Sequence, residues 1–394
     1  MPNDESPRPA RISLQELHRD PALRARLFPI VGRELFLAHA GVSPLPQAAA
    51  DAIAAEARNA ALMHQEVDFQ TRLKKAREVA GTLFGVRASE VALLGPTSLG
   101  LGLVARGIDW RPGDEVVCYG DDYPANVYPW RDLERLGVRP VPLRPARVGE
   151  ITPDLVAAAV TPRCRLVALA SAHFLSGHPI DVAAIGKIAH DAGALFCLDG
   201  IQTLGAVRTP LDEVDFVAAD SHKWMLGPLA AGIFIVRERA QPLLRPALLG
   251  ADNIRSPHLL ASERIEPIEG AARYEAGVRN MLGIAGMTAS LELLGSFGIE
   301  SIEAHLLSLR RIAVPSLRDA GFEFLAADPE NTRGGIITFR KPGAEMRRLF
   351  ARLADDGITA SLRWTRDGSE WIRLSPHLYT TESDIARAVD LIQG

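Results

Sequence analysis

The chain has 394 residues, of which 47% are hydrophobic and 23% are charged, and its formal net charge is −4. This length predicts two domains, and the composition is that of a globular protein rather than a disordered one. The acidic balance argues against a nucleic-acid-binding protein, and no apolar run reaches the roughly 20 residues that span a bilayer.

The N-terminal residues and the cysteines indicate a cytoplasmic protein. Met1–Arg11 is polar and Pro-rich, without the apolar core of a signal peptide, so we expect no export. Cys118, Cys164 and Cys197 are widely spaced, which indicates reduced thiols rather than a disulfide framework. Since neither a CxxC nor an HExxH motif occurs, we expect no metal site.

The first third of the chain is predicted to be mainly helical. Residues 1–30 form an N-terminal segment with one short helix around Leu14–Leu27. A short strand at Glu34–Leu37 and an Ala-rich helical stretch from Pro46 to Phe84 follow.

From about residue 90, short apolar runs alternate with amphipathic helices, which predicts a mostly parallel, seven-stranded sheet covered by helices on both faces. The predicted strands are Val91–Leu94, Glu115–Tyr119, Arg139–Leu143, Leu166–Ala170, Leu195–Leu198, Phe216–Ala219 and Gly232–Val236. Only a short segment around Ser221–Pro228 separates the last two, so we expect them to be antiparallel neighbours.

The pattern changes near residue 270 to that of an α+β unit. Its predicted elements are helices Met281–Phe297, Ile302–Ala320, Ala344–Asp356 and Glu382–Ile392, and strands Phe322–Ala326, Gly335–Arg340, Ile358–Leu362 and Trp371–Ser375. The closing helix follows Thr380-Thr381, which are good caps. We therefore expect a large domain over residues 31–270 and a small C-terminal α+β domain over residues 271–394.

Lys223 is the first candidate functional residue. It lies in Asp220-Ser221-His222-Lys223-Trp224, directly after a predicted apolar strand. Partial desolvation there would lower the lysine pKa and favour the free amine that forms a Schiff base. The alternative is a surface lysine in a turn.

Asp199 is the second candidate, because it ends the apolar strand Leu195–Leu198. The carboxyl ends of strands are where α/β sheets bind ligands. A carboxylate in that place suits a buried cation such as a protonated pyridine nitrogen, although it could also cap a helix.

A third segment, Gly95-Pro96-Thr97-Ser98-Leu99-Gly100, joins a strand to a helix. Hydroxyls and free amides at a helix start can hold a phosphate, or Thr97 and Ser98 could simply cap the helix. The same region contains GxGxxA at Gly100, Gly102 and Ala105, a dinucleotide-binding outline. The first glycine of that motif should end the strand, whereas Gly102 would fall inside the helix.

Together these segments resemble a pyridoxal-phosphate (PLP) enzyme of fold type I, in the class V aminotransferase family that includes cysteine desulfurases, kynureninases and isopenicillin N epimerase-like proteins. The resemblance runs from about Phe36 to the C-terminus. Further matching segments are Phe36–Gly41, Pro44–Pro46, Gly227-Pro228, Arg273–Gly277 with Asn280, Ser361–Arg363 and Arg373–Tyr379.

The resemblance implies roles around the cofactor. Lys223 would form the Schiff base and act as acid and base at the substrate α-carbon. Asp199 would keep the ring nitrogen protonated, so that the ring accepts electrons, and Gln202 would bond the phenolic oxygen. The residues that would hold the phosphate are Thr97, Ser98, Ser221 and His222.

Other implied positions depart from the common pattern. Tyr123 would stack on the ring where many relatives have a histidine, without replacing the acid–base work of an imidazole. Arg373 would bind the substrate carboxylate by a bidentate pair, and His173 would stand in for an asparagine of desulfurases. Val278 replaces a threonine that commonly reaches the neighbouring subunit's phosphate.

The resemblance implies a homodimer with active sites at the subunit interface and a small amino acid as substrate, with no nucleic-acid or membrane partner. We expect a class V aminotransferase first. A C–S or other β-lyase and an epimerase are alternatives with the same cofactor, and a NAD-binding oxidoreductase is a remote one. The loop Arg363–Glu370 contains no cysteine, which disfavours a desulfurase that forms a protein persulfide.

Overall fold

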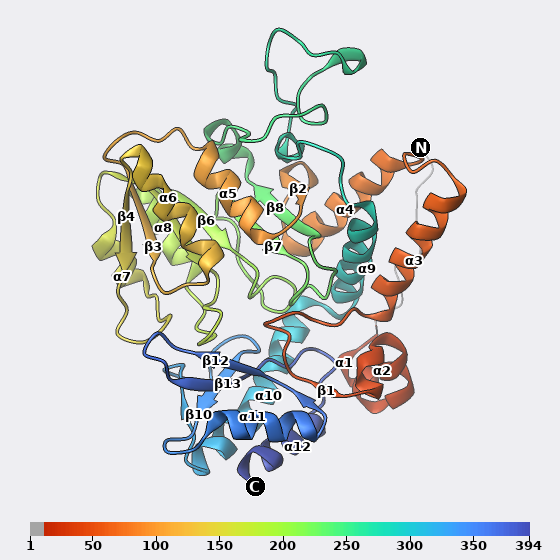
Figure 1. Ribbon diagram of the computed structural model, residues 1–394, viewed down its shortest axis with the longest axis vertical. Coiled ribbons are helices and arrows are strands. Elements are labelled where there is room, and N and C mark those ends of the chain that lie inside the picture. The colour runs from red at the N-terminus through yellow and green to blue at the C-terminus, as the bar shows by residue number, and fades with distance from the viewer. Residues whose placement is uncertain (1–11) are drawn as a thin grey trace.

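The computed structural model describes residues 12–394 and confirms an α/β fold with a mostly parallel seven-stranded sheet and a smaller C-terminal α+β unit (Figure 1). The absence of an export signal was predicted from Met1–Arg11, which lies outside the described residues. The limits of the two domains remain a prediction.

The large sheet has the strand order β2-β8-β7-β6-β5-β3-β4. Its strands are β2 Val91–Leu94, β3 Glu115–Tyr119, β4 Arg139–Leu143, β5 Cys164–Ala170, β6 Leu195–Asp199, β7 Phe216–Asp220 and β8 Gly232–Val236. Strand β8 is antiparallel to both of its neighbours, β2 and β7, and the remaining pairs are parallel. The predicted antiparallel step between β7 and β8 is therefore confirmed.

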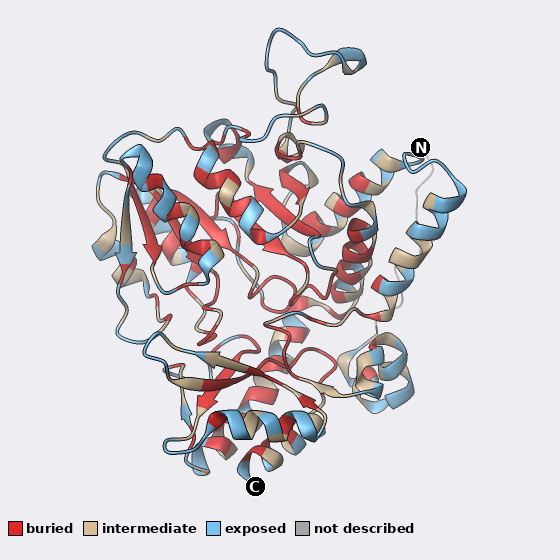
Figure 2. Ribbon diagram, in the orientation of Figure 1, coloured by how far each residue is buried: buried red, intermediate tan, exposed pale blue. Residues whose placement is uncertain are grey.

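Helices cover both faces of this sheet. They are α3 Gln47–Leu62, α4 Phe69–Phe84, α5 Thr97–Gly107, α6 Tyr128–Asp132, α7 Pro153–Ala159, α8 Val182–Asp191 and α9 Met281–Phe297. Strands β6, β7 and β8 at the centre of the sheet are wholly buried, as Figure 2 shows, whereas only Leu143 is buried in the edge strand β4. Short apolar runs without alternating polar residues are typical of strands covered on two sides.

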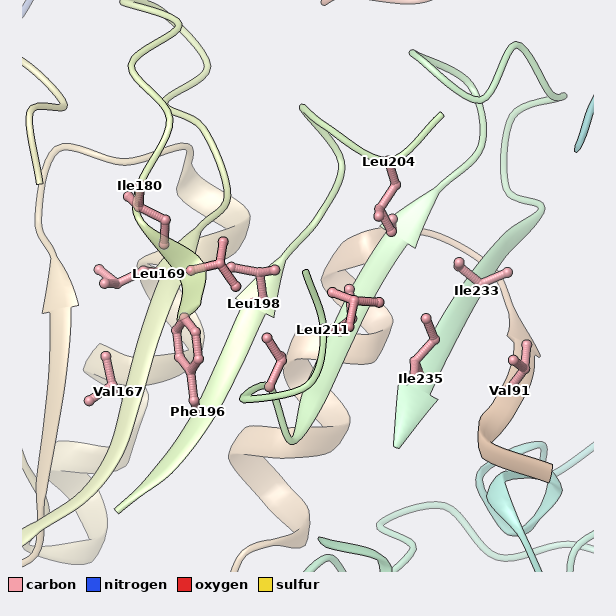
Figure 3. Packing of buried hydrophobic residues seen from close by; sticks show 14 of the residues in the cluster. Val91, Val167, Leu169, Ile180, Phe196, Leu198, Leu204, Leu211, Ile233 and Ile235 are labelled. Atoms are coloured by element: carbon pink, nitrogen blue, oxygen red, sulfur yellow. The ribbon is translucent and has the colours of Figure 1, made fainter. Parts of the chain in front are cut away.

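Alternate residues of the central strands supply two separate cores. In β6, Phe196 and Leu198 belong to the cluster on one face, part of which Figure 3 shows, and residues of α4, α8 and α9 complete that cluster. Leu195 and Cys197 belong to the cluster on the other face, with residues of α5 and α6. Gly100 lets α5 approach the sheet closely, because a Cβ there would lie 2.7 Å from the Ala218 Cβ. The helix start is thereby held against β7.

The N-terminal helix differs from the prediction. Two helices, α1 Leu14–Arg19 and α2 Pro21–Leu27, replace the single one expected. The break has a local cause, since the Asp20 carboxylate accepts hydrogen bonds from the first amides of α2 and Pro21 occupies its first position.

The C-terminal unit packs three helices on an antiparallel sheet of order β12-β13-β10-β9. Its elements are α10 Ile299–Asp319, β9 Glu323–Phe324, β10 Ile337–Arg340, α11 Met346–Asp355, β12 Ser361–Trp364, β13 Glu370–Leu374 and α12 Glu382–Gln393. Thr381 caps α12 in a capping box, as predicted. The strand expected at Ile358–Leu362 is split into β12 and a short β11, Ile358–Thr359, which pairs with β1, Leu35–Phe36.

Short 3-10 helices lie between the helices and strands of the described residues. They are η1 Pro29–Gly32, η2 Ala88–Glu90, η3 Pro124–Asn126, η4 Leu133–Leu136, η5 Glu238–Leu243, η6 Pro257–Leu259 and η7 Ala271–Tyr274. Within residues 12–394 no single helix is long and apolar enough to cross a membrane; only α9 and α10 taken together, across a 75° bend, pass that test by length and composition. That part of the chain also gathers no group of three or more metal-ligand side chains.

Candidate active site

The segments that follow five strands meet at one edge of the large sheet. Strands β2 to β7 run in the same direction, and the segments after the carboxyl ends of β2, β3, β5, β6 and β7 lie together at that edge. A cavity of about 520 Å³ lies at this edge, and the arginines of β12 and β13 complete its wall. A volume of this size is typical of a small-molecule or cofactor site.

Lys223 projects its amine into this cavity while remaining only 8% exposed. Burial lowers its pKa to about 8, and the charges of Arg373 and Arg363 act in the same direction against the opposing pull of Asp199. The loop before α3 holds its backbone, since the Ser43 Oγ donates to the Lys223 carbonyl at 2.6 Å. About a tenth of this amine is therefore unprotonated at pH 7, far more than for a lysine in water.

Asp199 and Gln202 lie beside Lys223 on the cavity wall. Burial raises the pKa of Asp199 to about 6, although the Ile201 amide and Lys223 favour the charged form. The Gln202 side chain is held at both ends, by Trp224 Nε1 at 2.9 Å and by the Ala40 carbonyl at 3.3 Å. Asp199 is therefore a carboxylate at neutral pH, poised opposite a cavity that can hold a cation.

The predicted phosphate residues are only partly brought together. Thr97, Ser98 and His222 line the cavity, next to the start of α5. The Thr97 hydroxyl accepts a hydrogen bond from the Asp220 amide at 2.9 Å, so it fastens α5 to β7 instead of capping α5. Ser221 is fully buried, and its hydroxyl donates to the Pro228 carbonyl at 3.0 Å instead of lining the cavity.

Tyr123 and Phe174 form the aromatic part of the wall. Their rings meet edge to face with 5.5 Å between centroids, and Lys223 Nζ lies 5.3 Å from the centroid of Tyr123. His173, the neighbour of Phe174, does not reach the cavity. Its ring nitrogens lie 3.1 Å from the Ser176 hydroxyl and 3.2 Å from the Asp121 carbonyl, and burial lowers its pKa to about 4.

Arg373 is the most deeply buried cation of the cavity, with 1% of its surface exposed. One Nη donates to the Phe174 carbonyl, but Nε and the other Nη have no hydrogen-bond partner among the described residues. Burial and the nearby charge of Arg363 lower its pKa to about 9, which leaves it charged at neutral pH. Unpartnered buried guanidinium nitrogens point to an anionic ligand.

Two charged residues, one on the wall and one behind it, were not assigned from the sequence. Arg363 adds a second guanidinium to the cavity, and a Cβ on Gly41 would lie 3.8 Å from its Nη2 and 3.9 Å from that of Arg373. Asp122 is a buried carboxylate directly before Tyr123. The matched segment Ser361-Leu362-Arg363 signalled the first, whereas nothing in the local sequence distinguished Asp122 from the exposed Asp121 beside it.

None of the three cysteines is a cavity nucleophile. Cys118, Cys164 and Cys197 lie in strands β3, β5 and β6, and all three are buried. Burial raises the thiol pKa of Cys118 to about 12 and that of Cys164 to about 11, and it also raises the pKa of Cys197. Thiols in this state react poorly.

The residues of the cavity fit PLP. A buried amine at Lys223, a buried carboxylate at Asp199 and a helix start at Thr97 match the aldehyde, ring nitrogen and phosphate of that cofactor. His222 Nδ1 is buried without a hydrogen-bond partner of good geometry among the described residues, although it lies 3.0 Å from an Asp220 oxygen. By contrast, Gly100, Gly102 and Ala105 all lie inside α5, so the strand-to-helix turn lacks the glycine pattern of a dinucleotide site.

Comparison with known sequences agrees with this fit. A family model for class-V aminotransferases matches residues 35–387. A probable cysteine desulfurase of Methanothermobacter thermautotrophicus is 30% identical over 271 residues, 68% of this chain and 66% of that protein, just under two thirds of its length. An uncharacterized aminotransferase of Bacillus subtilis, YcbU, is 24% identical over 372 residues, 93% of this chain and 96% of its own.

Solved structures share the fold. The apo cysteine desulfurase of Thermococcus onnurineus superimposes with a TM-score of 0.87 at 20% identity, covering 95% of this chain and 97% of its own. The cystine C–S lyase C-DES, in complex with its product cysteine persulfide, has a TM-score of 0.84 at 21% identity, covering 93% of this chain and 99% of its own.

The state of the Lys223 amine predicts how cofactor uptake depends on pH. Only the neutral amine attacks an aldehyde, so the rate at which apoprotein takes up PLP covalently should rise with pH around a midpoint near 8. Stopped-flow absorbance from pH 6 to 10 measures this, with Lys223→Ala as the control without uptake. A midpoint near 10.4, the ordinary value for lysine, would contradict the desolvated amine.

Proposed function

This chain belongs to the class-V aminotransferase family of PLP-dependent enzymes, and we propose that it is a lyase that cleaves the C–S bond of a cysteine-derived amino acid by β-elimination. Removal of the α-proton and departure of sulfur with the Cβ–S electron pair, followed by hydrolysis, yield a 2-oxo acid and ammonium. The sulfur leaves as a small-molecule product and not on the protein: as sulfide from cysteine, as a persulfide from cystine, or as a thiol from an S-substituted cysteine.

The observation that carries the proposal is the closed, thiol-free hairpin between β12 and β13. Asp367 folds its tip by accepting from the Thr365 hydroxyl at 2.6 Å and the Ser369 amide at 3.0 Å. Arg366 fastens the tip to Asp121, 2.5 Å away beside the cavity. Because no cysteine lies in this loop and all three thiols are buried, a persulfide relay through the protein is disfavoured.

The family relatives support C–S chemistry. The matched relatives and structures include cysteine desulfurases and a cystine C–S lyase. In an enzyme that cleaves a C–S bond without an accessible protein thiol, the sulfur would leave with a small-molecule product. We therefore favour the lyase over the aminotransferase expected first.

In this proposal the arginines select and orient the substrate. Arg373 grips the α-carboxylate with its free Nε and Nη, the geometry that a planar guanidinium offers to a carboxylate. The charge of Arg363 on the same wall strengthens anion binding. Gly41 leaves the space between the two guanidinium groups open, because it has no side chain.

Lys223 and Asp199 move and hold the protons. PLP, when bound, supplies an electron-accepting ring that stabilises negative charge at the substrate α-carbon. Lys223 Nζ has the near-neutral pKa that a general base requires and takes up the α-proton. With PLP bound, the Asp199 carboxylate would keep a proton on the ring nitrogen, Gln202 would donate to the phenolic oxygen, and Tyr123 would cover the ring.

We place the phosphate at the start of α5. Thr97 and Ser98 can donate their hydroxyl protons, and His222 adds a ring nitrogen from the neighbouring loop. We also propose a homodimer with active sites at the subunit interface. Val278, which is 89% exposed, and the apolar side chains of Leu260 and Ile265 lie on the segments that follow β8, where a partner subunit would cover them.

Transamination is the second candidate. The relative that aligns over 93% of this chain is an uncharacterized aminotransferase, and transamination needs the same proton transfers at Lys223. The two reactions differ in their products, because transamination releases no ammonium and requires a keto-acid acceptor.

Product analysis separates these reactions. With L-cystine or L-cysteine and no keto acid, the holoenzyme should release ammonium and 2-oxo acid in equal amounts, together with low-molecular-weight sulfur. Variants with Cys118, Cys164 or Cys197 replaced by Ala should retain this chemistry, since no thiol takes part. Product that forms only after a keto acid is added, or a persulfide trapped on the protein, would refute the proposed lyase.

Arg373→Lys tests the carboxylate clamp. An ammonium retains the charge but loses the bidentate geometry, and loss of a charge-assisted hydrogen bond costs about 1.5–3 kcal/mol. We therefore expect kcat/KM for α-amino acids to fall roughly 10- to 150-fold, at about 1.4 kcal/mol per decade, with PLP content unchanged.

Arg340→Lys, on the neighbouring strand β10 and outside the cavity, is the matched control and should leave kcat/KM unaltered. The clamp assignment would fail if Arg373→Lys lost its PLP. It would also fail if activity on amines without a carboxylate fell as much as activity on α-amino acids. Arg363 would then be the next candidate.

A further inference from the structure

The aromatic wall of the cavity is held from behind by buried polar residues. Tyr123 is 49% exposed, and among the described residues its ring makes an aromatic contact with Phe174 and a cation–π contact with the Lys223 amine. These two contacts alone do not fix the tilt of the ring. Its backbone, however, enters η3 directly after Asp122, and the orientation of the ring depends on that turn.

A chain of hydrogen bonds fixes the turn. The Tyr123 amide donates to Asp122 Oδ1 at 2.7 Å, and Asn126 Nδ2 donates to Asp122 Oδ2 at 3.0 Å. The Trp130 indole in turn donates to Asn126 Oδ1 at 3.0 Å. Asn126 and Trp130 are fully buried, and Asp122 is 9% exposed.

The donor-to-acceptor direction of these hydrogen bonds requires a side chain at position 122 that only accepts. An indole N–H can only donate, so it fixes the Asn126 oxygen toward Trp130 and the Asn126 amino group toward position 122. The side chain at position 122 must therefore accept from both Asn126 and the Tyr123 amide. A carboxylate does this with its two oxygens. An asparagine at position 122 that accepts from the Tyr123 amide would turn its own amino group toward the amino group of Asn126.

The carboxylate is retained at an energetic cost. Burial and the neighbouring Asp199 charge raise the pKa of Asp122 to about 7, against the hydrogen bonds that favour its charged form. A buried charge with no catalytic contact of its own needs another reason to be present. Among the described residues, that reason is the turn that carries Tyr123.

We propose that Asp122 is a positioning residue: by terminating the chain Trp130–Asn126–Asp122 it holds the ring of Tyr123 against the bound cofactor. The inference rests on the proposed placement of Tyr123 at PLP, but it is independent of whether the reaction is elimination or transamination.

An exchange of the two polar residues tests this role. In Asp122→Asn the donor conflict with Asn126 should release the turn. In the double variant Asp122→Asn with Asn126→Asp, every hydrogen bond can form again: Asn at position 122 accepts from the Tyr123 amide and donates to Asp at position 126, which accepts from Trp130. The double variant has the wild-type composition, and its negative charge lies at position 126 instead of position 122.

The readouts are the induced circular dichroism of bound PLP and the rate of PLP transfer to an apoprotein acceptor. Tyr123→Ala sets the scale, because a lost aromatic contact worth about 0.5–1.5 kcal/mol should speed PLP release roughly 2- to 13-fold. Asp122→Asn should lose most of the induced dichroism and release PLP at a rate close to that of Tyr123→Ala. Adding Asp122→Asn to Tyr123→Ala should change neither readout further.

The exchanged double variant should regain the wild-type dichroism and release rate. The proposal would be overturned if the double variant folded but did not regain the wild-type dichroism and release rate. The carboxylate would then be needed at position 122 itself. The proposal would also be overturned if Asp122→Asn and Tyr123→Ala were additive, or if Tyr123→Ala left both readouts unchanged. None of these results depends on the products formed, so failure of the proposed lyase reaction is seen separately.

Discussion

The chemistry that we propose for this protein depends on one amine being held out of water. Lys223 is buried beside the ends of five strands, and this burial lowers its pKa. The same burial strengthens the electrostatic interactions of Lys223 with Asp199 and Arg373. The groups compensate each other: Asp199 favours the charged amine, and the arginines oppose it. A reactive lysine, an ionised carboxylate and an anion site can therefore coexist at neutral pH within one cavity.

The fold around that amine could largely be predicted from the sequence. Uninterrupted apolar runs such as β6 require cover on both faces, and the short link between β7 and β8 leaves no room for a crossover helix. Because parallel strands carry their ends to one edge, Asp199 and Lys223 were expected together, and the structure brings them together. The single helix expected around Leu14–Leu27 is divided because Asp20 caps α2 and Pro21 occupies its first position.

Side-chain direction could not be predicted in the same way. Ser221 and His222 are adjacent in sequence, yet only His222 lines the cavity, because the Ser221 hydroxyl is taken up by the Pro228 carbonyl. His173 is likewise turned to Ser176 and Asp121. These outcomes depend on hydrogen-bond partners distant in sequence, which a motif does not specify, and the same is true of the partners that distinguish Asp122 from Asp121. The roles of the site residues remain proposals that rest on this geometry.

Borohydride reduction of the holoprotein, followed by peptide mapping, tests most directly whether the buried amine is the attachment point of PLP. Reduction converts the link between PLP and a lysine into a stable pyridoxyl group. We predict that this group is found on the peptide containing Ser221-His222-Lys223-Trp224, with Lys223 as the modified residue. A pyridoxyl group on any other lysine, or no label after incubation with PLP, would contradict the account.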